Sequence, residues 1–78
     1  MTVYEIKKII LSKILDAEVI VIDTTGFGNH FSVKVISKIF KEQSIIEQHK
    51  MVLSTLKNQM KGFKAPIHAL KIKTCIKN

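Results

Sequence analysis

Residues 66–74 read PIHALKIKT, and this segment organises the fold that we predict for the chain. It begins at the only proline and then alternates apolar and polar residues, which is the pattern of a strand with one face toward a core. We therefore predict a final strand over residues 67–74. In that strand His68 shares a face with Leu70 and Ile72, at the rim of the buried layer. Lys71 and Lys73 lie on the opposite face.

Two helices with start signals in the sequence precede this strand. Thr2 with Glu5, and Ser44 with Glu47, each fit a capping box, in which the two side chains bond each other's backbone N–H. The first helix covers residues 3–15, and its apolar stripe consists of Val3, Ile6, Ile9, Ile10, Leu11, Ile14 and Leu15. The longer helix follows Ser44 and ends near Gly62, and its stripe consists of Ile45, His49, Val52, Leu53, Leu56, Met60 and Phe63.

The segment between the helices predicts a β-hairpin and one helical turn. Residues 19–22 are all β-branched and do not alternate, which favours an interior strand. Residues 30–35 alternate, and the side chains that we expect to face inward are Phe31, Val33 and Val35. Two glycines in residues 23–29 provide the turn of an antiparallel hairpin. Residues 37–43 then form a short helical turn that carries Ile39 and Phe40 to the core.

Together these elements give the order α-β-β-α-α-β in a single domain over residues 1–78. We predict an α+β fold in which a three-stranded sheet has helices packed on one face. This order is that of the second type of KH domain. No apolar run approaches 18 residues and the N-terminal segment does not resemble a signal peptide, so we expect a cytoplasmic protein without a membrane partner.

The charge of the chain favours an anionic partner. Thirteen lysines, no arginine and six acidic residues give a net charge of +7. Such a charge suits nucleic acid, an acidic protein surface or a membrane face, and it also fits a solvated lysine surface with no partner. Lysine without arginine argues against specific nucleic-acid recognition, because arginine makes the bidentate contacts to phosphate and guanine.

The residues available for catalysis or metal binding form no motif along the chain. His68 and the only cysteine, Cys75, share the final strand at an odd spacing, so they point to opposite faces and lie roughly 23 Å apart. No spacing matches a structural zinc site. His30 begins a strand on its polar face, and His49 is expected to pack within its helix stripe. We therefore predict that the protein is not an enzyme.

Nucleic-acid binding is the alternative function that this order of elements permits. The second KH type clamps the nucleic-acid backbone with a G-x-x-G loop between its two later helices. The corresponding residues 41–44 read KEQS and contain no glycine. Exposed aromatic residues on which bases could stack are not predicted either. A helix-turn-helix formed by the short turn and the long helix is a weaker option, supported by several lysines.

Four segments, taken together, resemble the BolA family. Residues 26–33 (GFGNHFSV) resemble its G-x-G-S-H-F-x-V hairpin, and residues 35–40 (VISKIF) resemble V-x-S-x-x-F. Residues 48–52 (QHKMV) resemble R-H-R-x-V, and residues 67–74 (IHALKIKT) resemble I-H-A-L-x-I-x-T. The segments occur in the family's order and are most similar to its smaller bacterial branch.

The resemblance implies a class II KH-like fold and a non-enzymatic adaptor that binds a monothiol, CGFS-type glutaredoxin. In such complexes the two proteins share a [2Fe–2S] cluster, to which the glutaredoxin contributes its cysteine and a glutathione thiolate. The family's histidine ligand matches His68. The second ligand comes from the first hairpin loop, where residues 26–29 contain no histidine or cysteine and His30 is the nearest candidate. Alone, the chain is expected to be a monomer or a weak homodimer without the cluster.

The leading hypothesis is thus an adaptor for iron–sulfur trafficking or for iron or redox regulation, and the alternative is a DNA- or RNA-binding regulator. Gln48 and Lys50 replace the arginines beside the family's matching histidine, which argues against a DNA-binding role. The residues that we predict to contact a partner or nucleic acid are Gly26, Gly28, His49, Lys50, Lys71 and Lys73.

Overall fold

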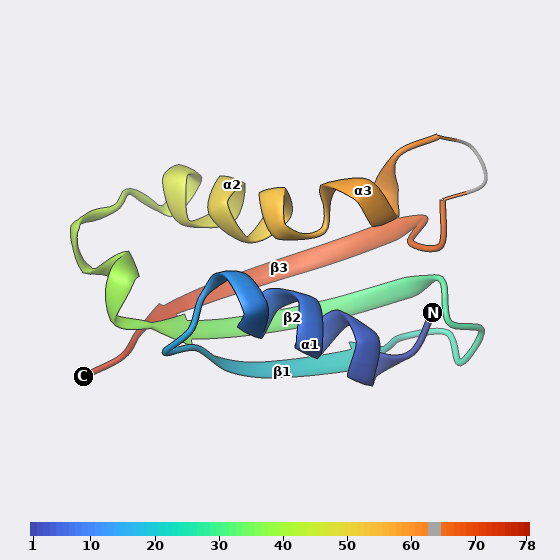
Figure 1. Cartoon of the computed structure of the whole chain (residues 1–78), viewed down its shortest axis with the longest axis horizontal. Helices are drawn as coiled ribbons and strands as arrows, with labels where there is room; N and C mark the ends of the chain where they lie inside the picture. Colours follow the sequence, from blue (N-terminus) through green and yellow to red (C-terminus); the bar gives the residue numbers. More distant parts are fainter. Residues whose placement is uncertain (63–64) are drawn as a thin grey trace.

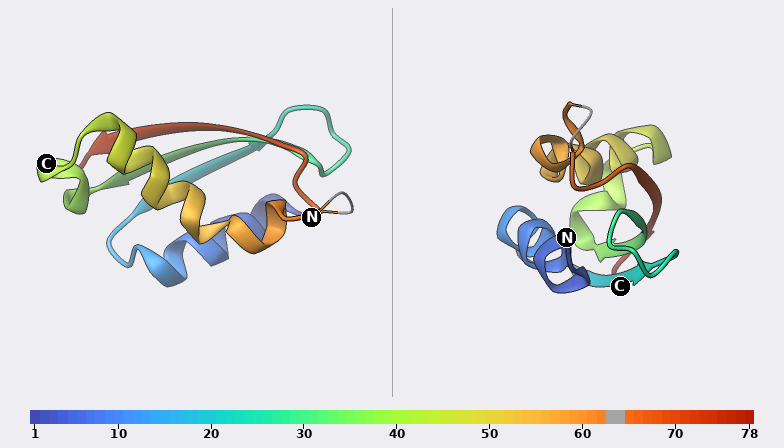
Figure 2. Two further views of the ribbon diagram at one scale, coloured as in Figure 1. Left: turned by 90° about the horizontal axis from the view of Figure 1, so that it is seen from above. Right: turned by 90° about the vertical axis from the view of Figure 1, so that its right-hand side faces the viewer.

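A computed structural model describes residues 1–62 and 65–78 of the chain. In order, its elements are α1 (Val3–Lys13), β1 (Glu18–Asp23), β2 (His30–Ser37), the 3-10 helix η1 (Lys38–Glu42), α2 (Ile45–Thr55), α3 (Lys57–Met60) and β3 (Ala69–Ile76). The strands form one three-stranded sheet in the order β1-β2-β3, in which β1 and β2 are antiparallel and β2 and β3 are parallel. The helices cover one face of this sheet (Figures 1 and 2), so the predicted α+β fold is confirmed.

The core lies between the helices and the inner face of the sheet. The central strand β2 alternates strictly, and its inward side chains Phe31, Val33 and Val35 are buried as predicted. The buried residues packed against them are Ile6, Ile10, Ile14, Val19, Phe40, Val52, Leu56 and Ile67. Alternation in a strand fixes which side chains face a core, which is why this part of the prediction held.

The prediction of an interior first strand is wrong. β1 is an edge strand, paired with β2 alone, and only its Val19 is fully buried. Ile20 and Ile22 are 51% and 57% exposed on the opposite face. A run of β-branched residues indicates a strand without specifying its neighbours, and here helices cover only one of the two faces.

The long helix is divided, and its buried face differs from the prediction. It breaks at Leu56, where φ is −106° and ψ is 9°, into α2 and α3. Ile45 is 62% exposed and His49 only half-buried, whereas Gln48 and Val52 are the buried residues of α2. Phe63, which we assigned to the same stripe, lies outside the described residues. The buried face of α2 therefore includes the polar residue Gln48 in place of Ile45. A prediction made from the spacing of apolar residues alone favours Ile45 and cannot place Gln48 in the core.

Both predicted capping boxes are present. Thr2 accepts from the Glu5 N–H and Glu5 accepts from the Thr2 N–H, and Ser44 and Glu47 do the same at the start of α2. Two apolar side chains that we assigned to the core, Leu15 and Ile39, are exposed. Leu15 follows the end of α1, and Ile39 belongs to the short η1 of five residues, so neither keeps the periodicity of a longer helix. Among the described helices, none has the length and hydropathy needed to span a membrane.

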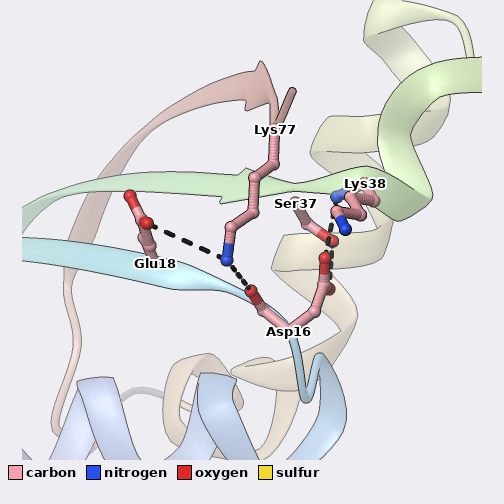
Figure 3. Close-up of polar contacts among 5 residues, drawn as sticks. All are labelled: Asp16, Glu18, Ser37, Lys38 and Lys77. Carbon is pink, nitrogen blue, oxygen red and sulfur yellow. Dashed lines mark hydrogen bonds and ion pairs between the residues drawn. The ribbon is translucent and has the colours of Figure 1, made fainter.

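A polar cluster around Asp16 joins the turn after α1 to the end of β2 and to the C-terminal segment (Figure 3). The Asp16 carboxylate accepts from the Ser37 hydroxyl at 2.5 Å and from the Lys38 N–H at 2.9 Å. The Lys77 ammonium donates to the Asp16 carbonyl at 3.0 Å and lies 3.8 Å from the Glu18 carboxylate. The hydrogen bond from Ser37, and secondly that from Lys38, hold the pKa of Asp16 below its ordinary value.

This lowered pKa predicts that part of the acid sensitivity of the fold comes from Asp16. A carboxyl with a depressed pKa stabilises the folded state above its unfolded pKa of about 3.9, and this contribution is lost as the pH falls through the folded value. We expect the free energy of unfolding to fall more steeply below about pH 4 for the wild type than for Asp16→Asn. Urea denaturation at pH 7, 4 and 3 measures this difference. Parallel pH profiles for the two proteins would contradict it.

Candidate functional site

The pairing of β2 with β3 brings His30 and His68 together at one end of the sheet. His30 is the first residue of β2, and its register partner is Ala69, the first residue of β3. The ring centroids of the two histidines are 6.2 Å apart and the ring planes meet at 84°. The two residues predicted as metal ligands, 38 positions apart in the sequence, are therefore neighbours in the structure.

The alternating pattern predicted that His68 lies within the final strand, but in the structure His68 directly precedes β3. Ile67 is buried and donates its N–H to the Gln59 carbonyl at 3.0 Å, whereas His68 is exposed. The N–H groups of His68 and Ala69 both donate to the Asn29 carbonyl, at 2.8 and 3.3 Å. Because the chain turns here before it enters β3, the imidazole is placed outside the core layer and available to a partner.

Asn29, which sequence reasoning missed, orients the site from both its backbone and its side chain. Its Oδ1 atom lies 2.9 Å from His30 Nδ1 and 3.4 Å from the Thr25 hydroxyl, which donates to it. An acceptor at this position suits the tautomer with its proton on Nδ1, which leaves Nε2 of His30 with a free lone pair. Asn29 therefore bonds the His30 imidazole directly and holds the backbone of His68.

Asp23 holds the loop that precedes His30. Its Oδ1 atom accepts from the N–H groups of Thr25 at 3.3 Å and Gly26 at 2.9 Å, and its Oδ2 atom accepts from that of Gly28 at 2.9 Å. An aspartate at the start of a turn-rich segment signals such bonds in the sequence. The loop also contains Phe27, three residues before His30, whose side chain is 85% exposed.

Gly28 is required by two independent features of this loop. Its φ of 73° lies in the left-handed region, and a Cβ there would be 2.9 Å from the Met1 carbonyl oxygen. The N-terminal ammonium of Met1 donates to the Gly28 carbonyl at 3.2 Å. Gly26 has a similar φ of 79° with no atom near its missing Cβ. The turn function expected of both glycines is thus confirmed, and their contact with a partner stays a prediction.

We expect Gly28→Ala to lower the free energy of unfolding by about 2 kcal/mol, and Gly26→Ala by about 1 kcal/mol. Both substitutions impose a positive φ on alanine, and only the first also displaces Met1. Urea denaturation of the two variants measures the difference directly. Equal losses would show that the N-terminal contact adds nothing to the loop.

The donor set at this end suits a metal centre completed by a second protein. Two imidazoles on one metal, with metal–nitrogen distances of about 2 Å, have ring centroids about 5 Å apart, so a small side-chain rotation suffices. Within residues 1–62 and 65–78, no group of three His, Cys, Asp or Glu side chains is arranged to hold a metal ion. The remaining ligands would therefore have to come from a partner.

The other predicted contact residues are distributed over two faces. His49 and Lys50 line a groove between α2 and β3, on the helix side of the sheet, together with Ile45, Leu70 and Ile72. Lys71 and Lys73 are exposed on the outer face, where Cys75 also lies near the far end of β3. Lys71 lines a shallow hollow of about 290 Å³ with His30, so the structure groups this predicted contact residue with one of the two histidines.

Comparison with known proteins gives consistent matches. The protein-family model described as BolA-like protein matches residues 13–78. Protein BOLA2 of Arabidopsis thaliana is 36% identical over 70 residues, which are 88% of this chain and 71% of that protein. A BolA-like protein of Dictyostelium discoideum is 47% identical over 47 residues, which are 60% of this chain and 40% of that protein. A bolA protein homologue from Coxiella burnetii, a solved structure, superposes with a TM-score of 0.77 at 28% identity over 97% of this chain and 91% of that one.

Proposed function

The chain belongs to the BolA-like protein family, and on that basis we propose that it is a cytoplasmic, non-enzymatic adaptor that binds a monothiol glutaredoxin and shares a [2Fe–2S] cluster with it. The glutaredoxin would contribute its cysteine and a glutathione thiolate, and this chain would contribute His68 and His30. The adaptor would serve iron–sulfur trafficking or iron and redox regulation.

One observation carries the ligand assignment: the imidazole rings of His30 and His68 are neighbours, 6.2 Å apart, at an exposed end of the sheet. Among residues 1–62 and 65–78, the His68 ring makes no hydrogen bond and the His30 ring bonds Asn29 alone. His30 is held through Nδ1 by Asn29, which leaves Nε2 for coordination. The ring of His68 is exposed, so an incoming protein can reach it without opening the core.

Bound there, the cluster would supply one-electron redox chemistry, and imidazole in place of thiolate on one iron generally raises the reduction potential. The protein's own contribution is to hold two imidazoles side by side at one end of the sheet. The Asn29 carbonyl accepts from the N–H groups of His68 and Ala69, and Asp23 holds the loop before His30, so the backbone beneath both rings is bonded in place. The partner's ligands would complete the coordination that the described part of the chain leaves incomplete.

The proposal is tested by mixing the protein with a cluster-loaded monothiol glutaredoxin and glutathione. We expect a heterodimer on gel filtration whose visible absorption and circular dichroism differ from those of the glutaredoxin alone. Two separate elution peaks and an unchanged spectrum would contradict the proposal. A heterodimer without a spectral change would indicate a protein-interaction module that does not ligate the cluster.

The alternative, a nucleic-acid-binding regulator, is distinguished by titration with duplex DNA at several salt concentrations. The joint between η1 and α2 has no glycine for a KH-type clamp, and Gln48 in the neighbouring helix is buried. Lysine electrostatics alone predicts weak binding that disappears near physiological salt. Binding that persists and depends on sequence would favour the regulator.

A further inference from the structure

The outer face of the sheet is uncovered, because all the helices lie against the other face (Figure 2). The register of the three strands defines its residues. They are Glu18, Ile20 and Ile22 of β1, His30, Ser32, Lys34 and Ile36 of β2, and Ala69, Lys71, Lys73 and Cys75 of β3. The β1 side is thus mainly apolar and the β3 side basic, with His30 at one end.

Three lysines on this face repel one another without compensation. Lys34 is the direct register partner of Lys73, and Lys71 is two residues away from Lys73 on the same face of β3. Like charges directly opposite on a sheet are destabilising. None of the three lysines makes an ion pair or a side-chain hydrogen bond within the described residues. The fold therefore gains nothing from this arrangement.

The acidic residues that could neutralise these lysines lie elsewhere in the fold, and most of them are already bonded. Glu5 and Glu47 cap helices, and Asp23 holds the hairpin loop. Asp16 bonds the end of β2, and Glu42 belongs to η1. Glu18 is the one acid that the register places on the outer face, and it lies 3.8 Å from the ammonium of Lys77. Lys34, Lys71 and Lys73 therefore remain available to negative charge on another molecule.

We propose that the outer sheet face is the docking surface for the protein that shares the histidine site, and that this partner presents an acidic surface beside an apolar patch. The inference rests on the proposed function and adds where the partner binds. Its acidic groups would meet Lys34, Lys71 and Lys73, and its apolar patch would cover Ile20 and Ile22. Continuity supports this placement, since His30 and Lys71 line the same hollow.

A protein surface fits this face better than nucleic acid does. The exposed isoleucines cover the part nearest the free edge of β1, and they offer nothing to a phosphate backbone. The residues of the face include no arginine, phenylalanine, tyrosine or tryptophan, whereas single-stranded nucleic acid is bound by stacking on aromatic side chains. Apolar and charged residues side by side are usual for protein–protein interfaces.

The experiment measures the binding of cluster-loaded monothiol glutaredoxin to Lys71→Glu/Lys73→Glu. We expect the Kd to rise at least about tenfold at physiological salt, because two attractive contacts become repulsive. The matched control is Lys8→Glu/Lys57→Glu, which makes the same change in net charge at exposed helix positions. It should change the Kd less than about threefold. An Ile20→Ser/Ile22→Ser variant should also weaken binding.

A stability measurement distinguishes docking from a structural role. In Lys73→Glu the new carboxylate lies opposite Lys34, so we expect a melting temperature equal to or above that of the wild type, together with weaker binding. A lower melting temperature accompanied by unchanged binding would overturn the inference. Equal losses of glutaredoxin affinity in Lys71→Glu/Lys73→Glu and in the control Lys8→Glu/Lys57→Glu would also overturn it.

The remaining outcomes separate this inference from the proposed function. If the wild type forms the heterodimer and Lys71→Glu/Lys73→Glu forms it equally well, the docking surface is wrong and the function stands. If the wild type binds no glutaredoxin, both fail. If the double variant loses affinity for a short duplex DNA but keeps that for glutaredoxin, the face belongs to nucleic acid and the inference is overturned.

Discussion

Replacing His68 with alanine should abolish the spectral change that the protein produces in a cluster-loaded glutaredoxin. An exposed imidazole contributes little to the fold, so His68→Ala should leave the melting temperature within a few degrees of the wild type. In the proposed complex, in contrast, loss of this ligand would remove a coordination bond that no third side chain among the described residues is placed to replace. Visible circular dichroism of the mixture measures the result.

His30 and His49 provide the comparison within the same chain. His30→Ala should weaken the cluster signal and shorten its lifetime, since the ring lies beside His68 and is oriented by Asn29. His49→Ala should leave the signal unchanged, because His49 lies in the groove between α2 and β3. An equal effect of all three variants would indicate a general loss of folding or affinity. Full signal in His68→Ala would refute the ligand assignment.

The largest effect on stability is expected from Gln48, a buried amide with every partner inside the protein. Its Nε2 donates to the carbonyls of Phe40 at 3.1 Å and Gln43 at 3.0 Å, and its Oε1 accepts from the Thr74 hydroxyl at 2.6 Å. These bonds connect α2 to η1 and to β3. Gln48→Met keeps the volume and removes the side-chain bonds of the Gln43 carbonyl and the Thr74 hydroxyl, whereas the Phe40 carbonyl keeps its bond from the Gln43 N–H. We expect a loss of about 3 kcal/mol and a melting temperature lower by roughly 10–20 °C.

Thr74→Val and Asn58→Ala are the controls for this prediction. Thr74→Val removes a single bond and should cost about 1 kcal/mol, and combining it with Gln48→Met should cost less than the sum, because the two share a bond. Asn58 is exposed, and its substitution should change stability by less than about 0.5 kcal/mol. A loss below about 1 kcal/mol for Gln48→Met would show that water replaces the amide's bonds.

Much of the candidate site was predictable, and the rest depended on pairing between strands. His68 and His30 stand in motifs that resemble the BolA family, but the sequence left the second ligand open. The roles of Asn29 and Asp23 became apparent only from their bonds to Thr25, Gly26, His30 and His68. Side-chain type and turn composition indicate that such bonds form, and the path of the chain decides which donors they meet.

The sequence by itself determined the local features of this protein. Strict alternation identified the inward face of β2, and the Thr2–Glu5 and Ser44–Glu47 pairs located both helix starts. These features depend on neighbours within a few residues, where propensity, capping and periodicity act. The order of elements and the α+β class follow from them.

Only the tertiary structure decided which residues meet across the chain. The parallel register of β2 and β3 placed His30 beside His68 and Lys34 opposite Lys73, and burial of Gln48 rotated α2 away from the predicted stripe. Periodicity fixes the face on which a side chain lies, but a register is a choice among long-range pairings made by packing the whole core. The neighbouring histidines and the lysines of the outer sheet face are both products of that choice.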